Sequence, residues 1–305
     1  MPNQNNNSNS ILSNYSGAKF SGAIFCFLMV FYVFITFIGQ FILSALSVNV
    51  QSTIYMAISG CFSIVAIILM LITSYLGKRQ ELRPMLSINK CKFNWYILSI
   101  LLFVGMFFAL GFANVIFTDF LNKIFNIPPN KMGENFTLNR YIALSISLAV
   151  LPAIFEELFF RGILLNSLIS GGKLFAVIVS SLCFAVYHCS ITQLLYQFIF
   201  GIAFSLLALN SKSIFPCILT HFLNNFIILT AYYFKIENVI FNTISVVIGF
   251  ICLALFIVFI IIKSYKNKLF NREKSKEKKE LINFLNPFGI GAFIICLSLI
   301  ILSIV

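Results

Sequence analysis

Charged residues are scarce in this chain. Only 10% of its 305 residues are Asp, Glu, Lys or Arg, whereas a soluble domain carries about 25%. Hydrophobic residues make up 60% of the sequence, and its mean hydropathy is +0.99. This composition excludes an ordinary soluble domain and predicts an all-α, polytopic bundle of transmembrane helices.

Side chains that commonly act in catalysis or bind metals are rarer still. The chain has nine acidic residues and two histidines, and Asp119 is its only aspartate. A protease that needs two aspartates is therefore excluded. The sequence also lacks an H-E-x-x-H zinc motif and a G-x-S-x-G serine elbow. Its eight cysteines form no C-x-x-C pair, and we interpret them as small buried side chains.

The net charge of +12 indicates membrane topology and not a nucleic-acid partner. Lys and Arg gather between residues 77 and 92, in two short turns at Lys173 and Lys212, and at eight positions between 263 and 280. With the 77–92 loop in the cytoplasm, alternating spans put all of these segments on the cytoplasmic side, as the positive-inside rule prefers. The N-terminus is then cytoplasmic. The abundance of Phe, Ile, Asn and Lys is typical of an AT-rich bacterial genome, so we expect a protein of a bacterial plasma membrane.

Apolar runs divide the chain into about eight or nine spans. The last run either spans the membrane or lies at its surface. We predict a disordered polar tail over 1–17, N-terminal transmembrane helices over 18–135, a core with the polar motifs over 136–236, and C-terminal transmembrane helices over 237–305 with a basic cytoplasmic loop at 263–280. The predicted apolar runs are 20–47, 54–76, 95–117, 138–169, 174–189, 194–209, 214–234, 239–262 and 289–305.

The sequence LPAIFEELFFRG at 151–162 places three charged residues inside a span. A charge at the centre of the bilayer costs at least about 2.5–3.5 kcal/mol, so it normally has a partner and a function. Glu157 and Arg161 are four residues apart and can pair on one helix face. Glu156 lies about 100° around the helix and can face elsewhere. Pro152 removes a backbone hydrogen bond and is expected to bend the helix.

Both histidines of the chain lie at a depth similar to that of Glu156. At about 1.5 Å per residue from the predicted cytoplasmic ends, Glu156 and His188 lie about 20 and 21 Å deep, and His221 and Asn225 about 12 and 18 Å. His221 and Asn225, four residues apart, point in one direction. Two carboxylates, two imidazoles and one guanidinium make a set suited to general acid–base catalysis or to metal binding.

Each of these features also has a structural interpretation. Glu157–Arg161 alone can be a structural ion pair, and His221 with Asn225 can join two helices. The hypothesis of an enzyme site rests on all of them meeting. Two further hypotheses stay open: a non-proteolytic bacteriocin-immunity or membrane scaffold protein, and a transporter that relays protons between Glu156 and His188.

Three ordered motifs resemble those of a known family. Glu156-Glu157-Leu-Phe-Phe-Arg161 matches EExxxR, Phe184-Ala-Val-Tyr-His188 matches FxxxH, and His221-Phe-Leu-Asn-Asn225 matches HxxxN. Over residues 141–234 the chain is similar to the CAAX prenyl endoprotease and bacteriocin-processing (CPBP, or Abi) family of intramembrane proteases. The flanking spans carry no such motif.

The resemblance implies hydrolysis of a peptide bond in a membrane-associated or lipidated substrate. Glu156 would be the general base for a water molecule, with His188 as its partner. His221 and Asn225 would donate hydrogen bonds to the oxyanion, and Glu157 with Arg161 would support the motif helix. Two mechanisms remain open, a metal-free glutamate mechanism and a metalloprotease mechanism in which Glu156, His188 and His221 hold Zn²⁺.

Overall fold

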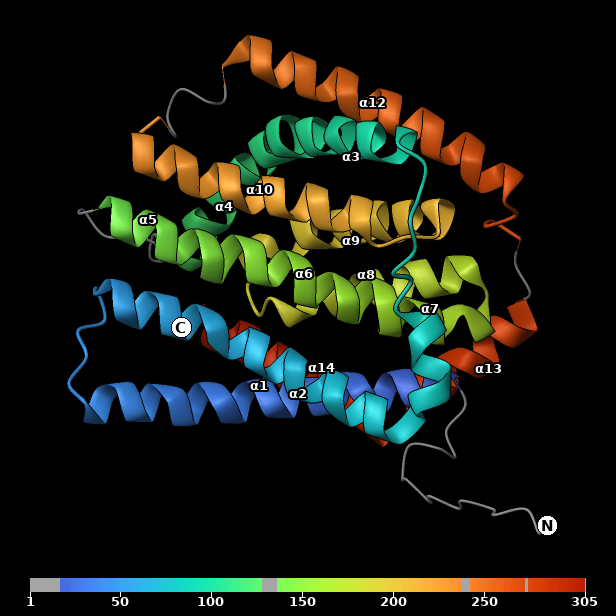
Figure 1. Cartoon of the computed structure of the whole chain (residues 1–305), viewed down its shortest axis with the longest axis horizontal. Helices are drawn as coiled ribbons and strands as arrows, with labels where there is room; N and C mark the ends of the chain where they lie inside the picture. The colour runs from blue at the N-terminus through green and yellow to red at the C-terminus, as the bar shows by residue number, and fades with distance from the viewer. Residues whose placement is uncertain (1–16, 128–135, 237–241, 272–273, 305) are drawn as a thin grey trace.

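The computed structural model describes residues 17–127, 136–236, 242–271 and 274–304, with backbone only for 77–83. These residues form helices and no strand, which confirms the predicted all-α class (Figure 1). The helices, in chain order, are α1 Gly17–Ala45, α2 Thr53–Met85, α3 Asn94–Val104, η1 Gly105–Leu110, α4 Gly111–Phe125, α5 Leu138–Leu144, η2 Ser145–Val150, α6 Leu151–Glu157, η3 Leu158–Leu164, α7 Leu165–Leu168, η4 Ile169–Gly171, α8 Lys173–Tyr187, α9 Ile191–Ser211, α10 Phe215–Phe234, α12 Thr243–Lys266, α13 Lys274–Phe284 and α14 Pro287–Leu302.

Seven of the described helical runs are long and apolar enough to cross a membrane, or eight if the bent pair α13–α14 counts as one span. The chain is therefore an integral membrane protein. Of the predicted eight or nine spans, eight agrees with the upper count of the described helices. Helix α8 has only 15 residues, so it is about 22 Å long, which is shorter than the hydrocarbon core of about 30 Å. Helices α13 and α14 meet at 70°, which places the basic α13 across the end of the bundle.

The run from α5 to η4 forms the centre of the bundle (Figure 1). It packs against α1 and α2 on one side and against α8, α9 and α10 on others, while α12 covers α3 and η1. Two stretches of the run, η2 and η3, are π-helical. A π-helical turn is wider than an α-helical turn and often marks a functional site. These two stretches flank α6, which carries Glu156 and Glu157.

The basic loops of the chain meet at one end of the bundle. Asn89 Nδ2 donates to the carbonyl of Lys212 at 3.1 Å, and Lys173 Nζ donates to the carbonyl of Asn267 at 3.1 Å. These bonds join loops that lie far apart in the sequence. We call this the basic end, and its described cations include Lys90, Lys92, Lys173, Lys212, Lys263, Lys266, Lys268 and, in α13, Lys274, Lys276, Lys278 and Lys279.

The opposite end holds the α1–α2 turn, the start of α5 and the end of α10. There Tyr141 stacks on Tyr233 with ring centroids 4.7 Å apart, and Arg140 contacts Met56. The third helical run continues to Phe125, beyond the predicted end at 117. The predicted polar tail lies outside the described residues except for Gly17, which begins α1.

Candidate active site

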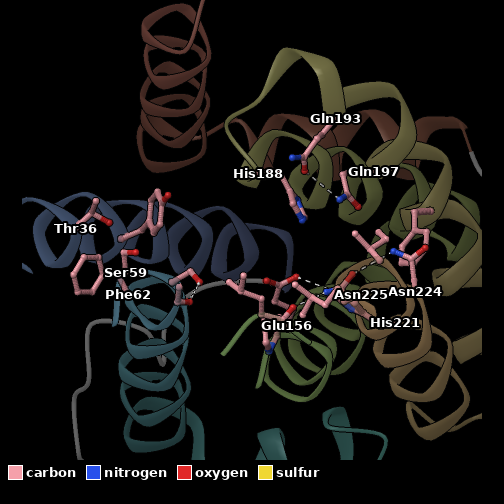
Figure 2. Close-up of a pocket in the computed structure, with 18 of the residues that line it drawn as sticks. Thr36, Ser59, Phe62, Glu156, His188, Gln193, Gln197, His221, Asn224 and Asn225 are labelled. Carbon is pink, nitrogen blue, oxygen red and sulfur yellow. Dashed lines mark hydrogen bonds and ion pairs between the residues drawn. The ribbon is translucent and has the colours of Figure 1, made fainter. Parts of the chain in front are cut away.

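The four predicted catalytic residues line one cavity of about 530 Å³ (Figure 2). Glu156 enters it from α6, His188 from the turn after α8, and His221 and Asn225 from α10. Figure 2 shows His188 across the cavity from Glu156 and Asn225. The three motifs therefore meet although 69 residues separate Glu156 from Asn225 in the sequence.

Glu157 lies behind the cavity and joins two of the motifs. Its Oε1 accepts a hydrogen bond from Arg161 Nη1 at 2.9 Å, which confirms the predicted pair, and it lies 2.9 Å from His221 Nδ1. Glu157 is 0% exposed and Arg161 1%. A buried charge of this kind is stable only when it is paired and hydrogen-bonded. The Glu157–His221 contact is the part that the sequence analysis missed, because a spacing of 64 residues carries no local signal.

The hydrogen bonds fix which nitrogen of each histidine faces the cavity. A carboxylate and a carbonyl can only accept, so Nδ1 of His221 donates to Glu157, and Nδ1 of His188 donates to the carbonyl of Phe184 at 2.8 Å. Nε2 of each ring is left for the cavity. His221 Nε2 lies 3.9 Å from Glu156 Oε2, which has no hydrogen-bond partner among the described residues.

Pro152 explains how Asn225 is held. In a regular helix the N–H of residue 152 would donate to the carbonyl of Leu148, but proline has no N–H. The Leu148 carbonyl instead accepts from Asn225 Nδ2 at 3.0 Å. Asn225 Oδ1 accepts from Asn224 Nδ2 at 3.2 Å, and Tyr196 donates to Asn224 at 2.9 Å. One N–H of the Asn225 amide remains for the cavity.

Aromatic rings close the cavity on the side of the basic end. Phe160, Phe184 and Phe204 are fully buried. The Arg161 guanidinium carbon lies 4.0 Å from the ring centroid of Phe184 and 5.1 Å from that of Phe204. Cation–π contacts of this kind are worth about 2 kcal/mol when desolvated. They help to keep the Arg161 charge inside the bundle.

The structure brings Glu156, His188 and His221 to one cavity but not into a ready-made group of three metal ligands. Among the described residues, no three His, Cys, Asp or Glu side chains lie close enough together to hold a metal ion. In both histidines Nδ1 is engaged and Nε2 faces the cavity, an arrangement that suits either a hydrogen bond to water or a metal ligand.

Much of the cavity wall comes from residues that the motifs do not include. Helices α1 and α2 supply one side, and α9 supplies another through Gln193 and Gln197. Glutamines inside apolar spans could have predicted part of this wall from the sequence, because uncharged polar residues there also require partners. The non-motif polar residues of the wall are Tyr32, Thr36, Gln40, Ser59, Ser63, Gln193, Gln197 and Asn224.

The comparisons with known proteins agree with the motifs. Residues 138–227 match a family model described as type II CAAX prenyl endopeptidase Rce1-like. The matched segment runs from α5 into α10 and contains all three motifs. It confirms the similarity to the CPBP family. No curated protein and no solved structure matches the chain.

Proposed function

From the match of residues 138–227 to the Rce1-like CAAX prenyl endopeptidases, we propose that this protein is an intramembrane endopeptidase in which Glu156 activates water. The observation that carries the proposal is the meeting of Glu156, His188, His221 and Asn225 on one cavity. The family implies a substrate that is a membrane-associated peptide. We further propose that the protein belongs to a bacterial plasma membrane, with the basic end in the cytoplasm.

Water is activated between Glu156 and His188. The Glu156 carboxylate removes a proton from the water as its oxygen attacks the carbonyl carbon of the scissile peptide bond. His188 Nε2 accepts a hydrogen bond from the same water and orients it. In the second step the protonated Glu156 gives its proton to the leaving nitrogen, and the C–N bond breaks. The products are a carboxylic acid and an amine.

His221 and Asn225 stabilise the oxyanion. The free N–H of the Asn225 amide is one donor. His221 becomes the second donor only when Nε2 also carries a proton, because Nδ1–H is held by Glu157. An imidazolium at His221 balances an ionised Glu156, while Arg161 balances Glu157. The proton can therefore lie on Glu156 or on His221 without changing the net charge of the buried cluster, which favours proton transfer in a medium of low dielectric.

The proposal is tested by mapping new peptide N-termini in membranes. Cells that express the wild-type chain are compared with cells that express Glu156→Gln or His188→Ala at equal membrane levels. We expect a set of N-termini that appears with the wild type and is absent with both variants. The same N-termini in all three samples, or in none, would contradict the assignment. Purified wild-type protein in liposomes must then cut a synthetic peptide that spans a mapped site.

A further inference from the structure

The cavity lies towards the end of the bundle opposite the basic end. Gln40 is five residues before the end of α1 at Ala45, and Ser59 is six residues after the start of α2 at Thr53. Both positions are therefore about 8–9 Å from the end opposite the basic loops. Both residues line the cavity, together with Glu156. Gln40 is exposed at the rim.

The path from the basic end to Glu156 is closed. Glu156 lies 15 residues before Gly171, which is about 22 Å of helix. Phe159, Phe160, Leu164 and Leu168, which occupy that length, are each 0% exposed. The cavity therefore begins at Glu156 and extends away from the basic loops.

The wall of the cavity mixes polar and apolar side chains and is almost uncharged. Glu156 is the only acidic residue and no Lys or Arg occurs among the described lining residues. Three carboxamides form one face, at Gln193, Gln197 and Asn224. The two glutamines bond only weakly to each other, at 3.5 Å. Carboxamides both donate and accept, as a peptide backbone does. We call Gln193, Gln197 and Asn224 the carboxamide wall.

A second cavity of about 460 Å³ lies directly behind the carboxamide wall. Gln193, Gln197, Asn224, Asn225 and Ile228 line both cavities. The other side of the second cavity is mostly apolar and comes from α4, η1 and the end of α10. Its residues include Phe107, Gly111, Val115, Ala231 and Tyr232, together with the single amide of Asn114. The wall is thus a polar strip between the catalytic cavity and an apolar recess.

We infer that the site takes an uncharged peptide strand that enters from the membrane face opposite the basic end, lies along the carboxamide wall and places an apolar side chain in the second cavity. A peptide bond can be cut only where the substrate helix is unwound. Each backbone N–H and C=O freed in this way must find a partner inside the bilayer. The carboxamide wall offers such partners next to Glu156. A charged strand would meet no countercharge along the carboxamide wall itself.

Entry from that face is tested by cysteine accessibility in sealed vesicles of both orientations. Gln197→Cys and, independently, Gln40→Cys report on the cavity. Lys212→Cys marks the basic end and Lys235→Cys the opposite end, since both lysines are exposed. A membrane-impermeant maleimide is added from one side, and the labelling of the wild-type cysteines is subtracted. We expect the two cavity positions to label from the same side as Lys235→Cys. Labelling from the side of Lys212→Cys, from both sides or from neither would overturn the inference.

The ligand class is tested by protection of the Gln197→Cys label in a Glu156→Gln background. The probe is a ten-residue peptide of Ala, Val, Leu, Phe and Gln with both ends capped. At ten times its Kd it should slow labelling about tenfold. The same peptide with two Lys residues should not slow it. Protection by farnesol alone, by both peptides equally or by none of the probes would refute an uncharged strand as the ligand.

This inference rests on the proposed function, but different results would refute the two. Accessibility and protection require no hydrolysis, because both can be measured in the Glu156→Gln protein. A protein that hydrolyses peptides yet labels only from the basic end would retain the proposed function and lose the inference. A protein that labels as expected but yields no new N-termini would retain the inference about entry and lose the proposed function.

Discussion

Replacing Glu157 by Gln should impair both stability and catalysis, although Glu157 lines neither cavity. The substitution keeps the shape of the side chain and one accepting oxygen. It removes the negative charge that Arg161 Nη1 and His221 Nδ1 each approach to 2.9 Å. Arg161 is 1% exposed, so its guanidinium would remain buried without a counterion.

The magnitude follows from the burial of this pair. Removing one partner of a buried ion pair costs about 3–5 kcal/mol. Gln retains an acceptor, so we expect the free energy of unfolding to fall by about 3 kcal/mol. The imidazolium at His221 would also lose its balancing charge, and the amide could hold the ring in the other tautomer. Where a carboxylate orients a catalytic or ligating imidazole, its removal lowers activity by about 10–10⁴-fold. We expect kcat to fall within this range.

The assay uses purified protein in one detergent and a peptide that spans a mapped cleavage site. The thermal unfolding midpoint reports on stability, and kcat reports on the site. Glu280→Gln is the matched control, because Glu280 is a mostly buried carboxylate at the basic end that accepts from Ser170 at 3.2 Å. Equal effects of the two substitutions on kcat, or wild-type kcat and midpoint in Glu157→Gln, would refute the role of Glu157 in holding His221.

Three further substitutions test the site and the packing around it. Asn225→Ala removes an oxyanion donor and should lower kcat about 10²–10³-fold with a smaller change in KM; a loss confined to KM would contradict that role. Pro152→Ala restores a backbone N–H that competes with Asn225 for the carbonyl of Leu148. It should lower kcat by up to about 10²-fold, with unchanged helical content by circular dichroism. An unchanged kcat would contradict this competition. At Gly201 a Cβ would lie 2.8 Å from α8, so Gly201→Val should destabilise the protein by about 1–3 kcal/mol in thermal unfolding. Gly291→Ala, whose Cβ would meet one sulfur at 3.7 Å, is the control and should unfold as the wild type does.

Local spacing was enough to predict the polar pairs within single helices. The bond between Glu157 and Arg161, and the shared direction of His221 and Asn225, follow from a spacing of four residues on a helix. The structure confirms both. The number of residues per span also placed His188 and Glu156 at one depth, because helical rise is constant.

Contacts between helices could not be predicted in the same way. No spacing rule links Glu157 to His221, or Asn225 to the carbonyl that Pro152 leaves free. The carboxamide wall was missed for the same reason, since Gln193 and Gln197 become neighbours of Asn224 only when α9 packs beside α10. Such contacts depend on how helices rotate about their axes, and many side chains set that rotation together.

The sequence by itself therefore determined the fold class and the three motifs. A hydrophobic run long enough to cross the bilayer must form a helix there, and uneven charge orients it. Only the tertiary structure decided that Glu157 and not Glu156 holds His221, that Nε2 of both histidines faces one cavity, and that this cavity extends away from the basic end. The physical reason is that a hydrogen bond depends on distances of a few tenths of an ångström, which the packing of separate helices sets.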